Sequence, residues 1–399
     1  MDGAKCGLWM LAAAGLFAGA ARARALDASD VLIYEIGPVH LKPRVSFSEQ
    51  YDDNILRGPS PGAMEDFITI ISPGVGLQLG RIEANHIFFD YVMDQSLYAS
   101  HGTQDHRDHI LSLNTKIKRA RVTLEGQTGV QFLSGVIGGS FNLPGQRVDR
   151  VSYGDDYRLD YAISEKTGTY VAGGFAATDY KEGISLYDEN DLRATGGFAY
   201  KVTSRTSLFG ELYYGQTATS PNTSSLSNAP YSFIYGGFVG VNGDFTTQLK
   251  GSVKLGYEAR EFGGNTPGSK SPVVEVTLKD KFSEWTDVSL TYSRRSEVSV
   301  QVASQAYTSD SVSARLNQVL TPDGKLVANV GGDLVNSEYE NRGFYARRSD
   351  RNWRASVALV YRFQVWLSAQ LGYEFEKFTS NQYFEYDDNR FTVRVSVGY

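Results

Sequence analysis

Long segments of alternating apolar and polar residues recur from residue 41 to the C-terminus, and they constrain the fold more than any other feature. Leu367, Ala369 and Leu371, for example, alternate with Ser368 and Gln370. Successive side chains of a strand point to opposite faces, so each segment has one apolar and one polar face. The pattern lasts about ten residues, where ordinary globular strands run about five or six. We predict eighteen strands, at 41–51, 66–80, 83–98, 107–118, 120–134, 149–164, 168–180, 187–202, 205–217, 231–244, 246–261, 272–282, 285–299, 305–320, 325–338, 350–363, 366–378 and 387–399.

The connections between these strands alternate between short and long. Segments such as KRA and TPDG are short, whereas 99–107, 135–148 and 216–230 are longer and polar. Short periplasmic turns and longer extracellular loops are typical of an outer-membrane barrel. We therefore predict an all-β fold, a transmembrane antiparallel up-and-down β-barrel of about eighteen strands. A soluble all-β protein is the alternative, but repeated long hairpins do not suit a Greek-key sandwich.

The C-terminal segment FTVRVSVGY is expected to close the barrel. Lipid offers no hydrogen-bond partner to an open strand edge, so the last strand must pair with the first. Its apolar residues should face lipid, and its final aromatic should lie at the periplasmic interface. The segment also resembles the C-terminal signal read by the barrel-assembly machinery, which would be carried by Phe391, Val393, Val395, Val397 and Tyr399.

The N-terminus resembles a secretory signal peptide. Lys5 precedes an apolar run at 7–21, and Ala-Arg-Ala at 23–25 fits a cleavage site. The run is short for a membrane span of about 20 residues, which disfavours a retained anchor. We predict a signal peptide at 1–25, a periplasmic lead at 26–40 and the barrel at 41–399. Cys6, the only cysteine, would be removed with the signal, leaving no disulfide or thiolate chemistry.

Charge and hydropathy exclude several classes of protein. Removing residues 1–25 takes away three basic residues and one acidic residue, which moves the formal net charge from −6 to −8. A nucleic-acid partner is therefore not expected. Mean hydropathy is −0.30, and no apolar run after the signal approaches a transmembrane helix. If the chain crosses a membrane, it does so with strands.

The polar faces of the strands carry charges of both signs. We predict that these side chains line the lumen: Arg158, Arg193, Lys250, Lys254, Arg315, Arg354, Arg362, Arg394, Asp90, Asp94, Glu125, Asp160, Glu211, Glu258, Glu275, Asp333, Glu374 and Glu376. A ring of one sign would imply ion selectivity, whereas a mixture suits polar or sugar-like solutes. The alternative, which we prefer for any single residue, is that these charges only pair with one another and keep the wall wet.

Other motifs gave weaker signals. The glycine-rich segment 135–146 could constrict the pore, although an ordinary outer loop is the preferred interpretation. The His and Asp side chains of HGTQDHRDH at 101–109 could ligate a divalent ion, but their spacing matches no strong metal-site signature. The acidic tips at 51–54, 188–191 and 385–389 could hold Ca²⁺ but are better explained as solvated turns. We predict no metal, no cofactor and no catalytic residue, since no Ser–His or Asp–His pair stands out.

The segment VHLKPRVSFSEQYDDNIL, residues 39–56, narrows the class of barrel. A first strand that runs into a Tyr-Asp-Asp-Asn tip resembles the putative β-barrel porin 2 family of diderm bacteria. The resemblance implies an outer-membrane barrel over roughly 35–399, in contact with lipid and lipopolysaccharide, with no defined catalytic residues. It also leaves two functions open. We favour a water-filled pore for polar solutes; the alternative is export of a surface polysaccharide with periplasmic export components.

Overall fold

A computed structural model provides the structure of the chain. It describes residues 34–59, 61–81, 85–137, 146–181, 184–223, 231–264, 267–302, 305–339, 347–382 and 385–398. The predicted signal peptide at 1–25, most of the predicted lead and Tyr399 lie outside the described residues.

The described residues form nineteen strands and one short 3₁₀ helix. The elements are β1 (Tyr34–Ile36), β2 (Val39–Asp52), β3 (Asp66–Gly80), β4 (His86–Tyr98), η2 (Gly102–Gln104), β5 (His106–Arg119), β6 (Val122–Gly135), β7 (Val148–Ala162), β8 (Thr167–Tyr180), β9 (Tyr187–Lys201), β10 (Thr206–Pro221), β11 (Ser232–Asp244), β12 (Leu249–Phe262), β13 (Ser269–Ser283), β14 (Thr286–Val298), β15 (Ala306–Val319), β16 (Leu326–Tyr339), β17 (Ser349–Gln364), β18 (Leu367–Ser380) and β19 (Tyr386–Gly398).

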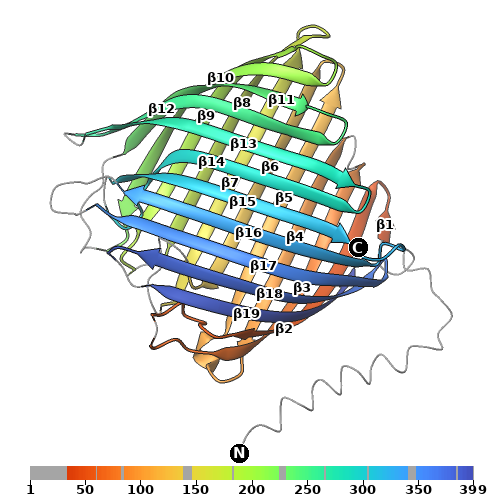
Figure 1. The fold of residues 1–399 in the computed structure, drawn as a ribbon, viewed down its shortest axis with the longest axis vertical. Coiled ribbons are helices and arrows are strands. Elements are labelled where there is room, and N and C mark those ends of the chain that lie inside the picture. The colour runs from red at the N-terminus through yellow and green to blue at the C-terminus, as the bar shows by residue number, and fades with distance from the viewer. Residues whose placement is uncertain are drawn as a thin grey trace, which may run out of the picture.

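Strands β2 to β19 form one closed antiparallel sheet. Each strand pairs with the next along the chain, and β19 pairs back with β2 from Gly398↔Arg44 to Arg390↔Asp52. Figure 1 shows the strands tilted steeply, so that the front wall of the barrel crosses the back wall. The predicted closed eighteen-stranded barrel, with the C-terminal segment as its closing strand, is confirmed.

One additional strand was not predicted. β1 pairs with the beginning of β2, from Tyr34↔Leu41 to Ile36↔Val39. Gly37 occupies the connecting turn at φ 61, a backbone conformation that glycine adopts readily. The described end of the predicted lead is therefore a small hairpin, and β2 begins at Val39 rather than at residue 41.

The two edges of the barrel differ in the length of their connections. On one edge, here called the turn edge, eight connections have two to six residues; on the other, the loop edge, nine connections have five to thirteen. β1 and the C-terminus both lie at the turn edge (Figure 1). The strands of the barrel have 13 to 16 residues. At a rise of about 3.3 Å per residue and a tilt near 45°, they suffice for an apolar band about 25 Å tall.

The apolar face of the sheet points outward. Leu212, Val239, Leu255 and Leu371 are between 54% and 74% exposed, each in mid-strand. Among the described residues, buried apolar side chains form just two small clusters, of four and three residues. A soluble monomer rarely exposes a contiguous apolar surface of this extent, whereas a barrel in lipid requires one. No helix in the described part of the chain has the length and apolar character needed to cross a membrane.

Outward-facing aromatic side chains mark both edges of this apolar surface. At the turn edge, exposed rings occupy the penultimate positions of β7, β9, β13 and β17: Tyr161, Tyr200, Phe282 and Phe363. Near the loop edge, the exposed rings are those of Phe67, Phe132, Tyr235 and Trp353. Aromatic rings favour the membrane–water interface because they are partly apolar and partly polar. Two such girdles frame the band that lipid would cover.

Substitutions at adjacent positions of β19 test which face meets lipid. Val393 is 50% exposed on the outward face, whereas Thr392 shares the opposite face with Gln50. We predict that Val393→Asp impairs assembly and Thr392→Asp does not. The cost should fall below the ~2–4 kcal/mol that Arg or Lys incurs at mid-bilayer. The measurement is the folded fraction, seen as heat-modifiable mobility, after refolding into vesicles. Equal folded fractions for the two variants would contradict the assignment of faces.

Candidate functional site: the lumen and its narrowing at the loop edge

Strand register places all eighteen charged residues predicted for the lumen on one face of the sheet. Directly opposed pairs such as Glu125↔Arg158, Lys254↔Glu275 and Arg354↔Glu376 share that face. Nζ of Lys254 on β12 lies 3.2 Å from Oε1 of Glu211 on β10, with β11 between them. Such contacts across an intervening strand are favoured on the concave side of a closed sheet. This face therefore points inward.

One part of the inward wall is a connected series of charges and rings from β7 to β14. It consists of Arg158, Tyr170, Glu211, Lys254, Glu275 and Arg295. Arg158 lies 3.6 Å over the Tyr170 ring, whose hydroxyl donates to Glu211. Lys254 joins Glu211 to Glu275 at 3.2 and 3.4 Å, and Arg295 contacts Glu275 at 2.9 Å. We call this series the wall ladder; its alternating signs leave little net charge.

Aromatic rings of this wall lie over glycines on the neighbouring strand. A Cβ added to Gly197 would overlap the Tyr170 ring, and one added to Gly236 would come within 2.6 Å of the Tyr213 hydroxyl oxygen. Glycine thus leaves the room that each ring occupies. Tyr170 and Tyr213 are only 4% and 6% exposed. These rings therefore support the wall and are not available as a stacking surface for a solute.

On the other side of the lumen, three arginines converge on Glu376. Its carboxylate lies 3.1 Å from Arg57, 3.3 Å from Arg354 and 3.0 Å from Arg390. Tyr386 donates a further hydrogen bond of 2.9 Å, and the Glu376 side chain has no exposed surface. We call this group the Glu376 hub. A buried carboxylate is tolerated there because several charged donors replace the water it has lost.

Arg57 brings the β2–β3 loop, described at 53–59 and 61–65, into the lumen. Nη1 of Arg57 donates to the carbonyl oxygen of Val136, just beyond β6, at 3.0 Å. β18 and β6 are separated by six steps around the eighteen-stranded barrel, so Arg57 bridges about a third of its circumference. Asn54 and Ile55 of the same loop are buried. The loop therefore narrows the lumen at the loop edge.

The backbone and charge of Arg57 both reflect this position. Its φ of 48 lies in the left-handed region, which residues other than glycine adopt only when their surroundings impose it. Burial by itself lowers the pKa of the Arg57 guanidinium. The neighbouring carboxylates, Glu376 first among them, outweigh burial and hold that pKa above its usual value. Arg57 thus stays charged at any physiological pH.

A second segment also folds inward, the end of the β14–β15 hairpin. Pairing of β13 with β14 stops at Val274↔Arg294, whereas β14 stays paired with β15 as far as Val298↔Ala306. Beyond the hairpin strands, the Val300 carbonyl accepts a 2.8 Å hydrogen bond from the amide of Tyr187, at the start of β9. β9 and β14 lie five steps apart in the sheet. The lumen is thus narrowed from two sides at the loop edge.

The predicted constriction at 135–146 stays a prediction. Residues 138–145 lie outside the described residues. In the described part of the segment, the carbonyl oxygen of Val136 accepts the hydrogen bond from Arg57. Among the described loops, the inward-folded segments are the part of the β2–β3 loop around Arg57 and the β14–β15 tip. Neither was anticipated from the sequence.

The histidines of segment 101–109 do not converge on one point. Nδ1 of His101 lies 2.9 Å from Asp66, that of His106 lies 2.8 Å from the Gln104 carbonyl, and that of His109 lies 2.9 Å from the Tyr91 hydroxyl. Each ring therefore has a separate partner. The segment is not assembled as a metal site.

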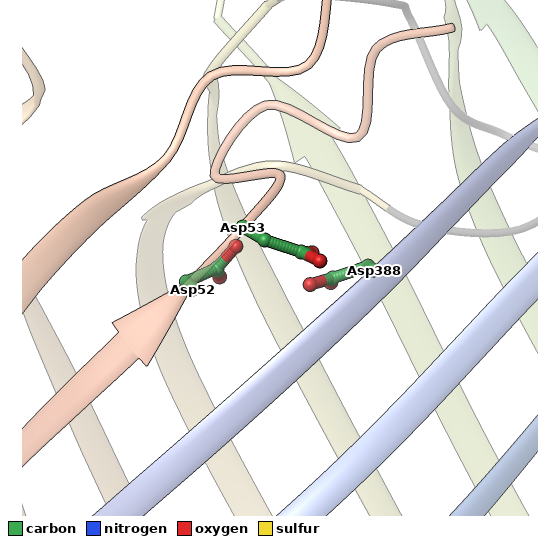
Figure 2. A group of neighbouring side chains, drawn as sticks. All are labelled: Asp52, Asp53 and Asp388. Carbon is green, nitrogen blue, oxygen red and sulfur yellow. The ribbon is translucent and has the colours of Figure 1, made fainter. Parts of the chain in front are cut away.

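Within the described residues, one group has the geometry of a metal site. Asp52, Asp53 and Asp388 each offer a carboxylate oxygen, and these atoms lie within 4.8 Å of one another. Figure 2 shows the three side chains directed toward one another: Asp52 from the end of β2, Asp53 from the loop that follows it, and Asp388 from β19. The acidic tips at 51–54 and 385–389 therefore meet, and two of these carboxylates are buried rather than solvated. The tip at 188–191 takes no part in this group.

Sequence reasoning missed the residues that organise the loop edge. Arg390 and Asp388 continue the polar face of the closing strand beyond Arg394, so the alternation itself could have identified them. The identical tetrapeptide YDDN at 51–54 and 386–389 also marked both strands of the seam, which is the β19–β2 pairing that closes the barrel. Arg57 carried no signal, because its partners depend on how its loop folds.

Three comparisons place the chain among known proteins. The family model described as "Putative beta-barrel porin 2" matches residues 34–399. Comparison with curated proteins gives no match. Similar solved structures include Pseudomonas aeruginosa OpdK with vanillate, 10% identical over 90% of this chain and 99% of that chain, at a TM-score of 0.48. Others are Pseudomonas aeruginosa OpdL (14%, 91% and 99%, 0.46) and Acinetobacter baumannii OccAB4 (12%, 91% and 99%, 0.45).

The Glu376 hub makes a prediction about stability. Glu376→Gln removes the charge that three guanidiniums share, so we expect a loss of about 3–5 kcal/mol in the free energy of unfolding. The control is Glu338→Gln, which breaks an exposed pair with Arg347 and should cost no more than about 1 kcal/mol. Urea-dependent unfolding in vesicles measures both variants. Equal losses would mean that the hub contributes no more than a surface pair.

Proposed function

The chain belongs to the putative beta-barrel porin 2 family, and from this premise we propose that its lumen is a water-filled path for small polar solutes. A porin-type β-barrel of the outer membrane accounts for the closed sheet and the outward apolar face. What we propose is the class of solute that passes through the lumen.

The observation that carries this proposal is that the charges on the inward wall are paired and partly exposed. The side chains of Arg158 and Asp160 are 44% and 38% exposed, and the Arg315–Asp333 pair is similarly accessible. Charges retained on that face require water or opposite charge around them. A wall whose charges are paired and also accessible to water can conduct hydrated solutes.

The class of solute follows from the mixture of signs. The wall ladder and the Glu376 hub both combine acidic and basic groups, so neither forms a ring of one sign. A single-sign ring would select ions, whereas opposed charges favour neutral polar or zwitterionic solutes that can orient between them. The two inward segments at the loop edge favour small solutes. No described feature favours polysaccharide export or catalysis, so the pore is the one function we carry forward.

Processing and assembly form part of the same proposal. Residues 1–25 are removed during secretion, and the barrel-assembly machinery recognises the closing strand. Phe391 and Val393 are exposed on the outward face, as such recognition requires, while Tyr399 lies outside the described residues. Lipid and lipopolysaccharide surround the finished barrel.

Single-channel recording of the protein refolded into a planar bilayer tests the pore. We expect stable, ohmic current steps with weak preference between K⁺ and Cl⁻, because the wall carries both signs. A heat-modifiable, folded barrel that passes no current would overturn the proposal. Strong selectivity for one ion would preserve a pore but contradict the proposed class of solute.

Arg57 supplies a further prediction. Arg57→Ala removes the contacts with Glu376 and Val136 that hold the β2–β3 loop inward, so conductance should rise, by roughly twofold at most. Arg347→Ala is the control, since Arg347 lies at the same edge in an exposed pair with Glu338. The same bilayer recordings compare the two variants. Unchanged conductance in Arg57→Ala would mean that this loop does not limit the path.

A further inference from the structure

The same four residues, Tyr-Asp-Asp-Asn, occur on both strands that close the barrel. One copy, 51–54, spans the end of β2 and the start of the following loop; the other, 386–389, begins β19, and both lie at the loop edge of the seam. The two copies contact each other directly, since the backbone amide of Asn389 donates to Asp53 at 2.7 Å. Acidic side chains from the first and last strands are thereby brought to one place.

Three of these acidic side chains form the group that we call the seam carboxylates, Asp52, Asp53 and Asp388. One oxygen from each lies within 4.8 Å of the others, and the side chains point toward a common centre (Figure 2). Neighbouring carboxylates repel one another unless a proton or a cation lies between them. Proximity alone is not a site, because acidic groups often cluster at a rim.

A separate observation concerns Asp388. Its side chain is 2% exposed, and among the described residues its Oδ1 atom has no hydrogen-bond partner. The ion pairs with Arg390 and Arg57 involve the other oxygen, Oδ2, at 3.1 and 3.8 Å. A buried carboxylate oxygen without a donor is costly and calls for an explanation such as an ion. Figure 2 shows the Asp388 carboxylate directed toward Asp52 and Asp53.

The net charge of the surrounding network also favours a bound cation. The seam carboxylates join the Glu376 hub through Asp388, and the ion pairs continue to Glu374. The joined network holds five carboxylates and three guanidiniums, a formal charge of −2 when all are ionised: Asp52, Asp53, Glu374, Glu376, Asp388, Arg57, Arg354 and Arg390. One divalent cation would neutralise it.

We propose that the seam carboxylates bind one hard divalent cation, Ca²⁺, which fastens the first strand of the barrel to the last. Carboxylate oxygens are the ligands that Ca²⁺ prefers, and its irregular coordination suits three unevenly placed carboxylates with water completing the shell. Mg²⁺ demands near-ideal octahedral geometry and fits this arrangement less well. The cation contacts both Asp52–Asp53 and Asp388, so opening the seam would release it.

Calcium titration of the refolded protein tests this site. The full barrel is refolded into phosphatidylcholine vesicles without lipopolysaccharide, treated with EDTA and titrated with CaCl₂ by calorimetry. We expect one Ca²⁺ per chain and a rise in the thermal unfolding midpoint on adding Ca²⁺. No binding at millimolar Ca²⁺, or no rise in the midpoint, would overturn the proposal.

Variants at two adjacent residues locate the bound ion. Asp388→Asn should weaken Ca²⁺ binding at least tenfold and abolish the rise in midpoint. Asp387→Asn is the matched control. Asp387 belongs to the same tetrapeptide, but it is exposed and is not one of the seam carboxylates. The Ca²⁺ affinity of this variant should therefore stay within twofold of wild type. If Asp388→Asn does not fold, Asp53→Asn takes its place with the same expectation. Equal affinity in the seam variant and the control would overturn the assignment.

A proton shared between the carboxylates is the competing account of Asp388. In that case the unfolding midpoint would change with pH but not with Ca²⁺ at constant pH, and the proposal would fail. Conductance plays no part in this test, so the cation site and the proposed pore stand or fall separately.

Discussion

Backbone hydrogen bonding in a medium without water is the constraint on which the whole structure depends. Lipid cannot satisfy an open strand edge, so the sheet must close, and β19 pairs with β2 to close it. Closure joins residues more than 300 positions apart in the chain, as in the contact between Asn389 and Asp53. It also fixes which face of every strand meets lipid, because one register runs around the entire barrel.

Once the faces are fixed, the inward charges must find partners among themselves. The wall ladder and the Glu376 hub are two solutions to that requirement, one from β7 to β14 and the other beside the seam. Both pair opposite signs and leave the wall polar, as the proposed passage of small polar solutes requires. The hub additionally holds the β2–β3 loop through Arg57, so the seam and the narrowing of the lumen share one set of contacts.

The architecture was predictable because its signal is local. Period-two alternation located all eighteen barrel strands, each boundary lying within a few residues of its observed place except the loop-edge end of β10, which extends to Pro221. The loop edge was not predictable, because its contacts join distant parts of the chain. Arg57 depends on Val136 and Glu376, and the β14–β15 tip depends on Tyr187. The acidic tips were recognised but interpreted as solvated, since sequence alone did not show that closure would bury Asp52 and Asp388.

Cysteine accessibility at two adjacent positions of β18 tests the central claim most directly. Gln370 shares the inward face with Arg394, whereas Leu371 is 57% exposed on the outward face. The only native cysteine, Cys6, lies in the predicted signal peptide, so single-cysteine variants can be labelled without interference. A water-soluble, membrane-impermeant maleimide should label Gln370→Cys and spare Leu371→Cys in the folded barrel. When a fluorophore is instead attached to each cysteine before refolding, a lipid-borne quencher should reach only the one at position 371. Labelling of Leu371→Cys in preference to Gln370→Cys would contradict a hydrated lumen enclosed by a lipid-facing apolar wall.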